Sequence, residues 1–267
     1  METDDETVLC HVENGVALVT LNRPERMNAW NRQMETHYFD LLDELDDAAE
    51  TRAIVVTGAG RGFCPGMDMG ALGKLSKGPG GQYKMSRPMS HPLTVRKPMI
   101  AAINGGCAGI GLVQALFCDL RFVAEGVKIA TAFTPRGLPA EFGASWLLTR
   151  LVGYGNALDL LLSGRPVRAE EALEMGLVNR VLPAERLVHE ARDYARNLAE
   201  NCAPIAMAAI KAQVAADWHR THRESLDEAV ELVADPNRRV DFKEGVAAYM
   251  EKRQPAFRPL PPKGTPL

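Results

Sequence analysis

Three short apolar runs, each followed by a glycine-bearing loop or a helical stretch, constrain the fold of this 267-residue chain more than any other feature. The runs are AIVVTG (53–58), MIAAIN (99–104) and DLRFVA (119–124). Continuous apolar runs of this length are typical of strands buried on both faces of a sheet. Because the strands alternate with helices, the pattern predicts an α/β fold in which most strands pair in parallel.

The N-terminal region adds a hairpin and an amphipathic helix. The runs TVLCHV and GVALVTL are joined at Glu13, Asn14 and Gly15, and Asn-Gly is a strong signal for a tight turn between antiparallel strands. In residues 31–50 apolar side chains then recur at spacings of four and three. The members of this face are Met34, Tyr38, Leu41, Leu45 and Ala48. We expect a helix that packs this face onto the sheet.

Two segments fall outside this core pattern. Residues 73–92 are dense in Gly, Pro, Ser and Lys, which predicts a mobile loop over or beside the functional site. From about Pro183 onward strand signals end, and helical patterns such as RESLDEAVELVA dominate. We therefore expect an α/β core over residues 1–190 and a C-terminal helical subdomain over residues 191–267.

Composition and charge exclude several classes of protein. With 34 acidic and 31 basic residues the net charge is -3, so no overall field attracts nucleic acid or an anionic membrane. No apolar stretch approaches the roughly 20 residues that a membrane-spanning helix requires. The N-terminus, METDDET, lacks the basic start and apolar run of a secretion signal. We expect a cytoplasmic protein.

The cysteines indicate neither a disulfide framework nor a metal centre. The five residues (Cys10, Cys64, Cys107, Cys118 and Cys202) are odd in number and widely spaced, and no CxxC or HExxH motif occurs. We therefore predict no metal site. Cys64 is interpreted as a small buried thiol, with a nucleophilic cysteine as the alternative.

Two glycine-rich segments directly follow strands: TGAGRGFCPGMDMG (57–70) and INGGCAGIGLVQAL (103–116). Backbone N–H groups in such turns, and at the helix start expected near residues 109–111, favour a developing negative charge. We expect donors from the two loops to converge on one oxygen, although each loop alone also fits a tight structural turn. The first does not fit dinucleotide binding, because GAGRG lacks the G-x-G-x-x-G spacing and Phe63-Cys64-Pro65 interrupts a helix.

Taken together, the motifs resemble the crotonase superfamily of enoyl-CoA hydratases and isomerases, and they occur in the family order over nearly the whole chain. The matching segments are LVTLNRPERMNAW (18–30), GAGRGFCPGMDM (58–69), INGGCAGIG (103–111), CDLRF (118–122), SGRPVRAEEALEMGLVNRVLP (163–183) and EGVAAYMEKRQPAF (244–257). The resemblance implies a spiral of repeated ββα units with a C-terminal helical trimerisation region, assembled as a homotrimer or as a hexamer of two trimers. It also implies an acyl-CoA thioester substrate and no cofactor beyond coenzyme A.

The resemblance further implies an oxyanion hole made of two backbone amides, those of Met67 in PGMD and of Ile110 in GIG. Isoleucine departs from the glycine that is usual at the second position and narrows the space beside the oxygen. Hydratases of the family carry two glutamates that activate water. This chain has Val113 and Phe133 at those places, and neither side chain can accept a proton.

A single carboxylate offers a substitute. Glu141 lies in GLPAEFGASW, similar to the loop of family members that shift a double bond from position 3 to position 2. One carboxylate suffices for that reaction if it removes a proton from C2 and returns it at C4. Apolar neighbours are expected to raise its pKa toward neutrality. The competing interpretation is an ordinary exposed loop glutamate.

The resemblance also suggests where coenzyme A binds, through basic side chains and backbone groups at the nucleotide edge and in the tail. The candidate residues are Arg26 and Ala29 in RPERMNA, Cys64, Gly66 and Asp68 in CPGMD, and Lys252 in YMEKR. For Asp68, and for Glu125 near CDLRF, nothing in the sequence indicates contact with the reacting part of the substrate.

The leading hypothesis from the sequence is therefore an enzyme that isomerises 3-enoyl-CoA to 2-enoyl-CoA with Glu141 as base and acid. The alternatives are a 2-enoyl-CoA hydratase that uses Glu141 alone and a non-catalytic acyl-CoA-binding protein. A serine hydrolase does not fit, because Ser145 lies in GASWL rather than in G-x-S-x-G.

Overall fold

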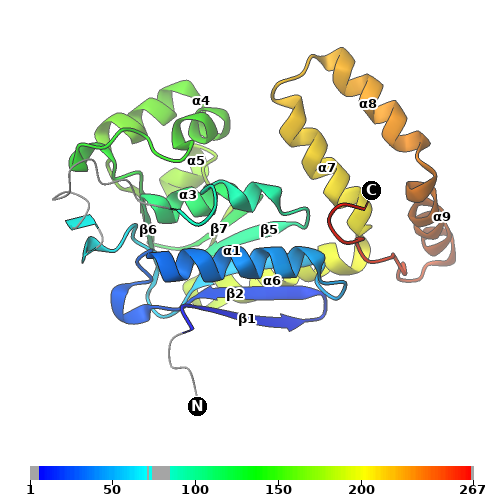
Figure 1. Cartoon of the computed structure of the whole chain (residues 1–267), viewed down its shortest axis with the longest axis horizontal. Helices are drawn as coiled ribbons and strands as arrows, with labels where there is room; N and C mark the ends of the chain where they lie inside the picture. Colours follow the sequence, from blue (N-terminus) through cyan, green and yellow to red (C-terminus); the bar gives the residue numbers. More distant parts are fainter. Residues whose placement is uncertain (1–5, 71, 74–84, 266–267) are drawn as a thin grey trace.

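The structure, a computed structural model, describes residues 6–70, 72–73 and 85–265, so most of the loop predicted over residues 73–92 lies outside the described residues. At its centre is a six-stranded sheet with the order β1-β2-β3-β5-β7-β10 (Figure 1). The strands are β1 (Val8–Glu13), β2 (Val16–Leu21), β3 (Ala53–Gly58), β5 (Met99–Ile103), β7 (Leu120–Ala124) and β10 (Arg180–Leu182). Pairing is parallel except between β1 and β2. The three apolar runs thus form β3, β5 and β7, as predicted.

A second, smaller sheet lies beside the first, with the order β4-β6-β8-β9. Its strands are β4 (Gly62–Cys64), β6 (Gly106–Ala108), β8 (Lys128–Ala130) and β9 (Val167–Arg168). The first three are parallel and β9 is antiparallel to β8. Each of β3, β5 and β7 is followed by a short strand of the small sheet, and the two series keep the same order. This repetition produces the spiral of ββ units expected from the resemblance.

The N-terminal hairpin and the first helix follow the sequence pattern closely. Asn14 and Gly15 have φ values of 51° and 77°, which are the left-handed conformations that the hairpin turn requires. Helix α1 (Arg32–Asp47) begins at Asn31, whose side chain accepts a hydrogen bond from the Met34 amide. The predicted face is buried at Met34, Tyr38 and Leu45, together with Phe39 and Leu42, whereas Leu41 is only partly buried.

The remaining elements of the core connect the two sheets and cover them. They are the 3-10 turns η1 (Pro24–Arg26), η2 (His91–Thr94) and η3 (Thr134–Arg136), and the helices α3 (Ile110–Phe117), α4 (Ala144–Ser163) and α5 (Ala169–Glu174). All eight residues of α3 are buried, which fits its place between the small sheet and α4. None of the described helices is long and apolar enough to cross a membrane.

Helix α6 (Ala184–Asn201) packs on the core and contains residue 190, where the sequence predicts the domain boundary. Its side chains at Leu187, Ala191, Ala195 and Ala199 recur every four residues and are buried, and the helix packs on strands β2, β3, β5 and β7. Residue 190 therefore lies inside a core helix. We place the boundary after Asn201, where the chain leaves the sheet. The helical pattern alone did not reveal which helices cover the sheet.

Helices α7 (Pro204–Asp217), α8 (His222–Ala234) and α9 (Pro236–Glu251) form an arm that stands to one side of the sheets (Figure 1). Large apolar side chains on this arm are exposed. They include Ile210, Val214, Leu226, Val230, Val233, Phe242, Tyr249 and Met250. Tyr249 and Phe242 are 84% and 70% exposed, which is unusual for aromatic residues of a monomeric domain.

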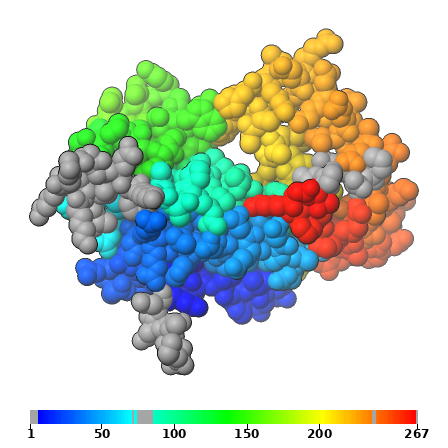
Figure 2. Space-filling model, in the orientation of Figure 1, coloured from blue at the N-terminus to red at the C-terminus, as the bar shows by residue number. Residues whose placement is uncertain are grey.

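The arm contacts the core again at the start of α4. The rings of Trp146 and Trp218 lie 4.5 Å apart between centroids, and His219 stacks on Trp146 at 5.7 Å. The Arg150 guanidinium lies over the Trp146 ring at 4.1 Å. In Figure 2 the green α4 region meets the gold end of α7 above an opening between the core and the arm. This aromatic cluster thus links the arm to the helix that follows Glu141.

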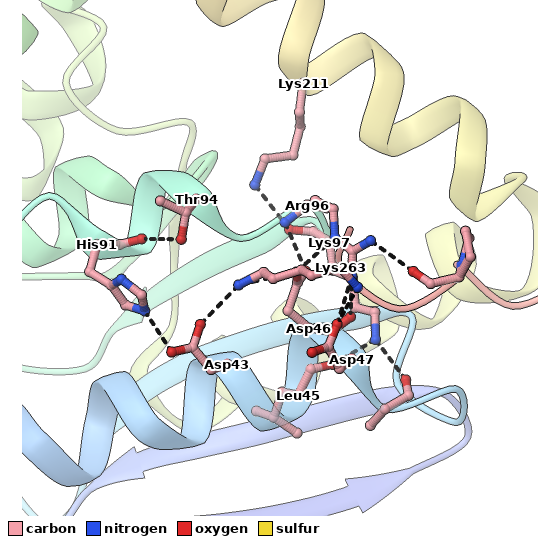
Figure 3. Close-up of polar contacts among 12 residues, drawn as sticks. Asp43, Leu45, Asp46, Asp47, His91, Thr94, Arg96, Lys97, Lys211 and Lys263 are labelled. Atoms are coloured by element: carbon pink, nitrogen blue, oxygen red, sulfur yellow. Dashed lines mark hydrogen bonds and ion pairs between the residues drawn. The ribbon is translucent and has the colours of Figure 1, made fainter. Parts of the chain in front are cut away.

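Beyond α9 the tail returns to the core through a polar cluster at the end of α1 (Figure 3). Arg96 donates to the fully buried Asp46 carboxylate at 2.8 Å and to the Pro261 carbonyl at 2.7 Å. Lys263 of the tail pairs with Asp43 at 2.9 Å, and the buried Lys97 ammonium donates to carbonyl oxygens at the end of α1. Burial lowers the pKa of Lys97 to about 8. Charged groups, rather than apolar packing alone, hold the tail on α1.

Candidate active site

The two glycine-rich loops lie side by side because the strands that precede them are neighbours. Strands β4 and β6 pair in parallel, with Cys64 opposite Cys107. A Cβ atom added to Gly109 would lie 3.7 Å from the Cα atom of Gly66, and one added to Gly111 would lie 2.1 Å from the Cys64 carbonyl oxygen. Only glycine permits this approach, so Gly111 brings the start of α3 against the end of β4.

The amide of Met67 is left free by the way its loop pairs with the segment before α1. Trp30 donates its N–H to the Gly66 carbonyl at 2.8 Å, and its carbonyl accepts from the Asp68 N–H at 2.9 Å. In such a parallel bridge the opposing residue, Met67, directs its own N–H away from Trp30. Among the described residues the Met67 N–H has no hydrogen-bond acceptor.

The amide of Ile110 is free for a different reason. Ile110 is the first residue of α3, preceded by Gly109 with φ 53°, so its N–H has no acceptor within the helix. The positive end of the helix adds to the attraction for an anionic oxygen there. The structure therefore places the two predicted donors, Met67 and Ile110, on adjoining loops.

The segment that carries Glu141 leaves the next strand of the same small sheet. Strand β8 pairs with β6 and ends at Ala130, and the chain then passes through η3 to Glu141 and α4. The carboxyl ends of β4, β6 and β8 thus lead, in this order, to Met67, Ile110 and Glu141. Ligands commonly bind at the carboxyl ends of parallel strands. All three residues predicted to be catalytic follow one edge of one sheet.

The apolar neighbours of Glu141 pack its loop against the core, and the backbone of the loop is strained at Phe142. Leu138, Ala140 and Phe142 pack against the core, while Glu141 itself is partly buried. Phe142 and Gly143 both have left-handed backbone conformations, with φ values of 53° and 79°. For a bulky residue such as Phe142 this conformation is costly, and such strain is found most often at functional sites.

The carboxylate of Glu141 has no hydrogen bond or ion pair with any described residue. Burial raises its pKa above the ordinary value, which is the direction expected from the sequence. A carboxylate of this kind binds a proton more readily than an exposed one and is still accessible enough to exchange it with a ligand. Glu141 is thus of intermediate burial, between an exposed loop glutamate and a buried acid.

The places of the hydratase glutamates are apolar in space as well as in sequence. Val113 is 1% exposed within α3, and Phe133 is 3% exposed at the start of η3. Neither residue provides a group that can activate water.

The residues proposed to bind coenzyme A fall into two separate regions. Arg26 is exposed at the end of η1, and its carbonyl accepts from the N–H of the buried Ala29 at 3.0 Å. Because Ala29 precedes Trp30, both residues lie near the Met67 loop. Lys252 directly follows α9, with φ 54°, and α9 stands at the opposite end of the molecule from β6 (Figure 1). The helix that leads to Lys252 is thus distant from the strand that leads to Ile110 within one chain (Figure 1).

Each of the three candidates in CPGMD makes contacts within the fold. The Cys64 thiol is fully buried, and burial raises its pKa to about 12, which favours the neutral thiol and the interpretation of Cys64 as a small buried residue. The expected role of Cys64 in binding coenzyme A stays a prediction. Asp68 pairs with Arg23 at 3.2 Å and accepts the Gly70 N–H at 2.9 Å. Gly66 supplies the close contact with Gly109.

Arg23 and Asn28 are the residues that sequence reasoning missed. The buried Asn28 side chain donates to the carbonyls of Ala59 and Gly62 and accepts from the Arg23 N–H at 2.8 Å. Both residues lie within the LNRPERMNA motif, but no spacing rule shows that their side chains reach the glycine loop. Within the ranges that the structure covers, no group of three or more His, Cys, Asp or Glu side chains is arranged to hold a metal ion.

Comparison with known proteins gives the family. The sequence model of the family described as Enoyl-CoA hydratase/isomerase matches residues 11–259. The chain belongs to this family of enzymes, within the crotonase superfamily. It is 36% identical over 262 residues to the 1,2-epoxyphenylacetyl-CoA isomerase of Escherichia coli, and the match covers 94% of this chain and 98% of the relative.

Solved structures of the enoyl-CoA hydratase/isomerase family share the fold. An enoyl-CoA hydratase from Mycobacterium marinum, EchA12_1, is 45% identical with a TM-score of 0.70, and the match covers 81% of this chain and all of that one. An enoyl-CoA hydratase from Bacillus anthracis is 27% identical with a TM-score of 0.86, covering 95% and 99% of the two chains. The predicted crotonase-like fold is thus confirmed.

Proposed function

We propose that this enzyme isomerises a 3-enoyl-CoA thioester to the 2-enoyl-CoA thioester, with Glu141 as the only acid-base group. The observation that carries the proposal is the Glu141 carboxylate, which is partly buried, has no partner among the described residues and has a raised pKa. The absence of a carboxylate at Val113 and Phe133 supports a reaction that needs one carboxylate rather than two.

In the proposed mechanism the thioester oxygen accepts hydrogen bonds from the amides of Met67 and Ile110. Ionised Glu141 removes a proton from C2, and the electron pair of the C–H bond delocalises into a dienolate whose charge rests on that oxygen. The protonated Glu141 then donates the same proton to C4, and the double bond moves to position 2. No atom is gained or lost, so no water or cofactor takes part.

Binding of coenzyme A and assembly are part of the same proposal. Arg26 and the backbone at Ala29 meet the nucleotide, while Lys252 reaches it from a neighbouring subunit, because the arm of one chain holds Lys252 away from its own loops. The exposed apolar side chains of α7, α8 and α9 support a homotrimer or a hexamer of two trimers. We also expect the enzyme to act in the cytoplasm.

The names of the relatives support two other reactions, which the experiment below must distinguish from isomerisation of 3-enoyl-CoA. Several relatives are named as probable enoyl-CoA hydratases, which fits hydration by Glu141 alone. The relative from Escherichia coli is named as an isomerase of an epoxide, 1,2-epoxyphenylacetyl-CoA. A non-catalytic acyl-CoA-binding protein is the third alternative.

Product analysis in water labelled with heavy oxygen separates these reactions. Purified enzyme is incubated with 3-enoyl-CoA, 2-enoyl-CoA and 1,2-epoxyphenylacetyl-CoA, and products are identified by mass spectrometry. The proposal predicts 2-enoyl-CoA from the first substrate, without incorporated label. A labelled 3-hydroxyacyl product formed faster than the isomer supports hydration and contradicts the proposal. Binding without turnover of any substrate indicates a binding protein, and also contradicts it.

A further inference from the structure

Arg23 forms a side-chain tie between the two segments that meet at Met67. Its Nη1 donates to the Ala29 carbonyl at 2.5 Å, and its Nη2 donates to the Asp68 carboxylate at 3.2 Å. Ala29 precedes Trp30, and Asp68 follows Met67. The guanidinium therefore spans the same two segments as the isolated backbone bridge between Trp30 and Met67, one residue to either side.

Both ends of this tie are themselves fixed. At one end, the Arg23 N–H donates to the Asn28 side chain at 2.8 Å, and the Asn28 N–H donates to the Arg23 carbonyl at 2.8 Å. At the other end, Asp68 accepts the Gly70 N–H at 2.9 Å. The hydrogen bond from Gly70, and then that from Arg23, lower the pKa of Asp68 against the opposing effect of burial. The carboxylate is thus held ionised and in place.

We propose that Arg23, through its bidentate contact with Ala29 and Asp68, is a positioning residue that fixes the direction of the Met67 amide. The proposal rests on the proposed function, in which that amide holds the thioester oxygen. The Met67 N–H lies between two anchored positions: the carbonyl of Gly66 is held by Trp30, and the side chain of Asp68 is held by Arg23. A rigid donor is worth more than a mobile one, because it needs no reorganisation when charge develops on the oxygen.

The alternatives for Arg23 are a direct contact with the phosphates of coenzyme A or a purely structural ion pair. Its side chain is only 16% exposed, and the Asp68 side chain 24%, so little of the guanidinium is left for a ligand. Ala29 and Asp68, the two partners of Arg23, each lie one residue from the Trp30–Met67 bridge. A contact that only stabilised the fold would not need to lie beside this bridge. The geometry therefore favours positioning.

The test uses acetoacetyl-CoA, whose bound enolate has an ultraviolet absorption band and carries its charge on the thioester and ketone oxygens. The pH midpoint of enolate formation is measured with the intact enzyme and compared with that of the free ligand. Variants are Arg23→Gln, Arg23→Lys and Asp68→Asn. Arg165→Gln, in the exposed pair of Arg165 with Asp159, is the matched control.

Parent enzyme is expected to lower the midpoint, and Arg23→Gln and Asp68→Asn to move it back toward that of the free ligand. In isomerisation assays both variants lose about 10- to 100-fold in kcat, within the cost of a misplaced or missing oxyanion donor, while KM changes less than about 3-fold. Arg23→Lys is expected to be intermediate, because lysine supplies one point charge rather than a fork. The double variant is no worse than either single variant if the pair acts as a unit.

Three outcomes overturn the proposal. The first is a pH midpoint of enolate formation in Arg23→Gln that equals that of the parent. The second is a rise in KM of this variant with kcat unchanged. The third is a fall in its thermal unfolding temperature while the pH midpoint and kcat stay those of the parent. The second outcome indicates a contact with coenzyme A, and the third a structural pair. If the parent itself leaves the midpoint of the free ligand unchanged, the oxyanion hole and thus the proposed function fail first, and the inference about Arg23 fails with them.

Discussion

Alanine at position 111 is expected to separate the loops that carry the Met67 and Ile110 amides. A Cβ atom on Gly111 would lie 2.1 Å from the Cys64 carbonyl oxygen, whereas real Cβ atoms essentially never come closer than 3.0 Å. That oxygen belongs to the backbone of β4, so no side-chain rotation relieves the overlap. The start of α3 must move by about 1 Å, and a misplacement of that size costs about 10²-fold in rate at a catalytic site.

The same substitution has two opposing effects on the free energy of unfolding. Alanine is better than glycine in a helix by about 1 kcal/mol. Forcing an extra group into a packed contact costs about 1–3 kcal/mol. We therefore expect a net loss of no more than about 2 kcal/mol, which leaves a domain of this size folded. Urea denaturation measures the free energy of unfolding of Gly111→Ala, and the isomerisation of 3-enoyl-CoA measures its kcat.

Gly106→Ala is the matched control within the same glycine-rich segment. A Cβ atom there would meet nothing within 4 Å, and we expect both kcat and stability to stay close to those of the parent. If Gly111→Ala folds and keeps the kcat of the parent, the contact between α3 and β4 does not position the Ile110 amide, and the reasoning is refuted.

Three further predictions concern the tail, the arm and the pH dependence. Arg96→Gln leaves the buried Asp46 carboxylate without its main partner, so urea denaturation should show a loss of about 3 kcal/mol; a loss below about 1 kcal/mol would contradict the importance of this pair. Trp218→Ala removes the ring that packs on Trp146, so hydrogen exchange should accelerate in the turn between α7 and α8 while the central sheet is unaffected; unchanged exchange in that turn would count against the anchor. Since burial raises the pKa of Glu141, kcat/KM should fall as pH decreases through a midpoint above the value of about 4.3 of a free glutamate. The effect on the free energy of unfolding has the opposite sign. Because the fold favours the protonated carboxyl group, the parent loses stability as pH rises through the raised pKa. Glu141→Gln should therefore be more stable than the parent at neutral pH, but not below about pH 4. Equal thermal unfolding temperatures at neutral pH would contradict the raised pKa.

The elements with long, regular patterns were predictable from the sequence. Strands β3, β5 and β7 are mostly apolar and are buried or nearly so along their length, and α1 repeats its apolar side chains at helical spacing, so the pattern of the sequence finds them. The sequence pattern of β4 and β6 indicates glycine-rich turns rather than strands. Each has three residues, and each is defined by its neighbour in the small sheet rather than by its own composition.

The candidate site was predictable only as far as backbone motifs and family resemblance reach. The sequence predicts Glu141, Met67 and Ile110 because glycines mark the loops that carry them and because those loops resemble family motifs. It does not predict the role proposed for Arg23, which depends on the meeting of residues 29 and 68 in space. Likewise, whether α6 covers the sheet or belongs to the arm depends on tertiary packing that an amphipathic pattern does not record.

The central claim is that one carboxylate, that of Glu141, moves the proton. The most direct test is the rate at which Glu141→Gln converts 3-enoyl-CoA to 2-enoyl-CoA, beside the parent and Glu125→Gln, an exposed control in the turn after β7. Glutamine keeps the size of the side chain but cannot take up the proton. The account predicts a loss of at least about 10²-fold in kcat for Glu141→Gln alone, with KM changed only a few-fold. Turnover by Glu141→Gln at the rate of the parent would contradict it.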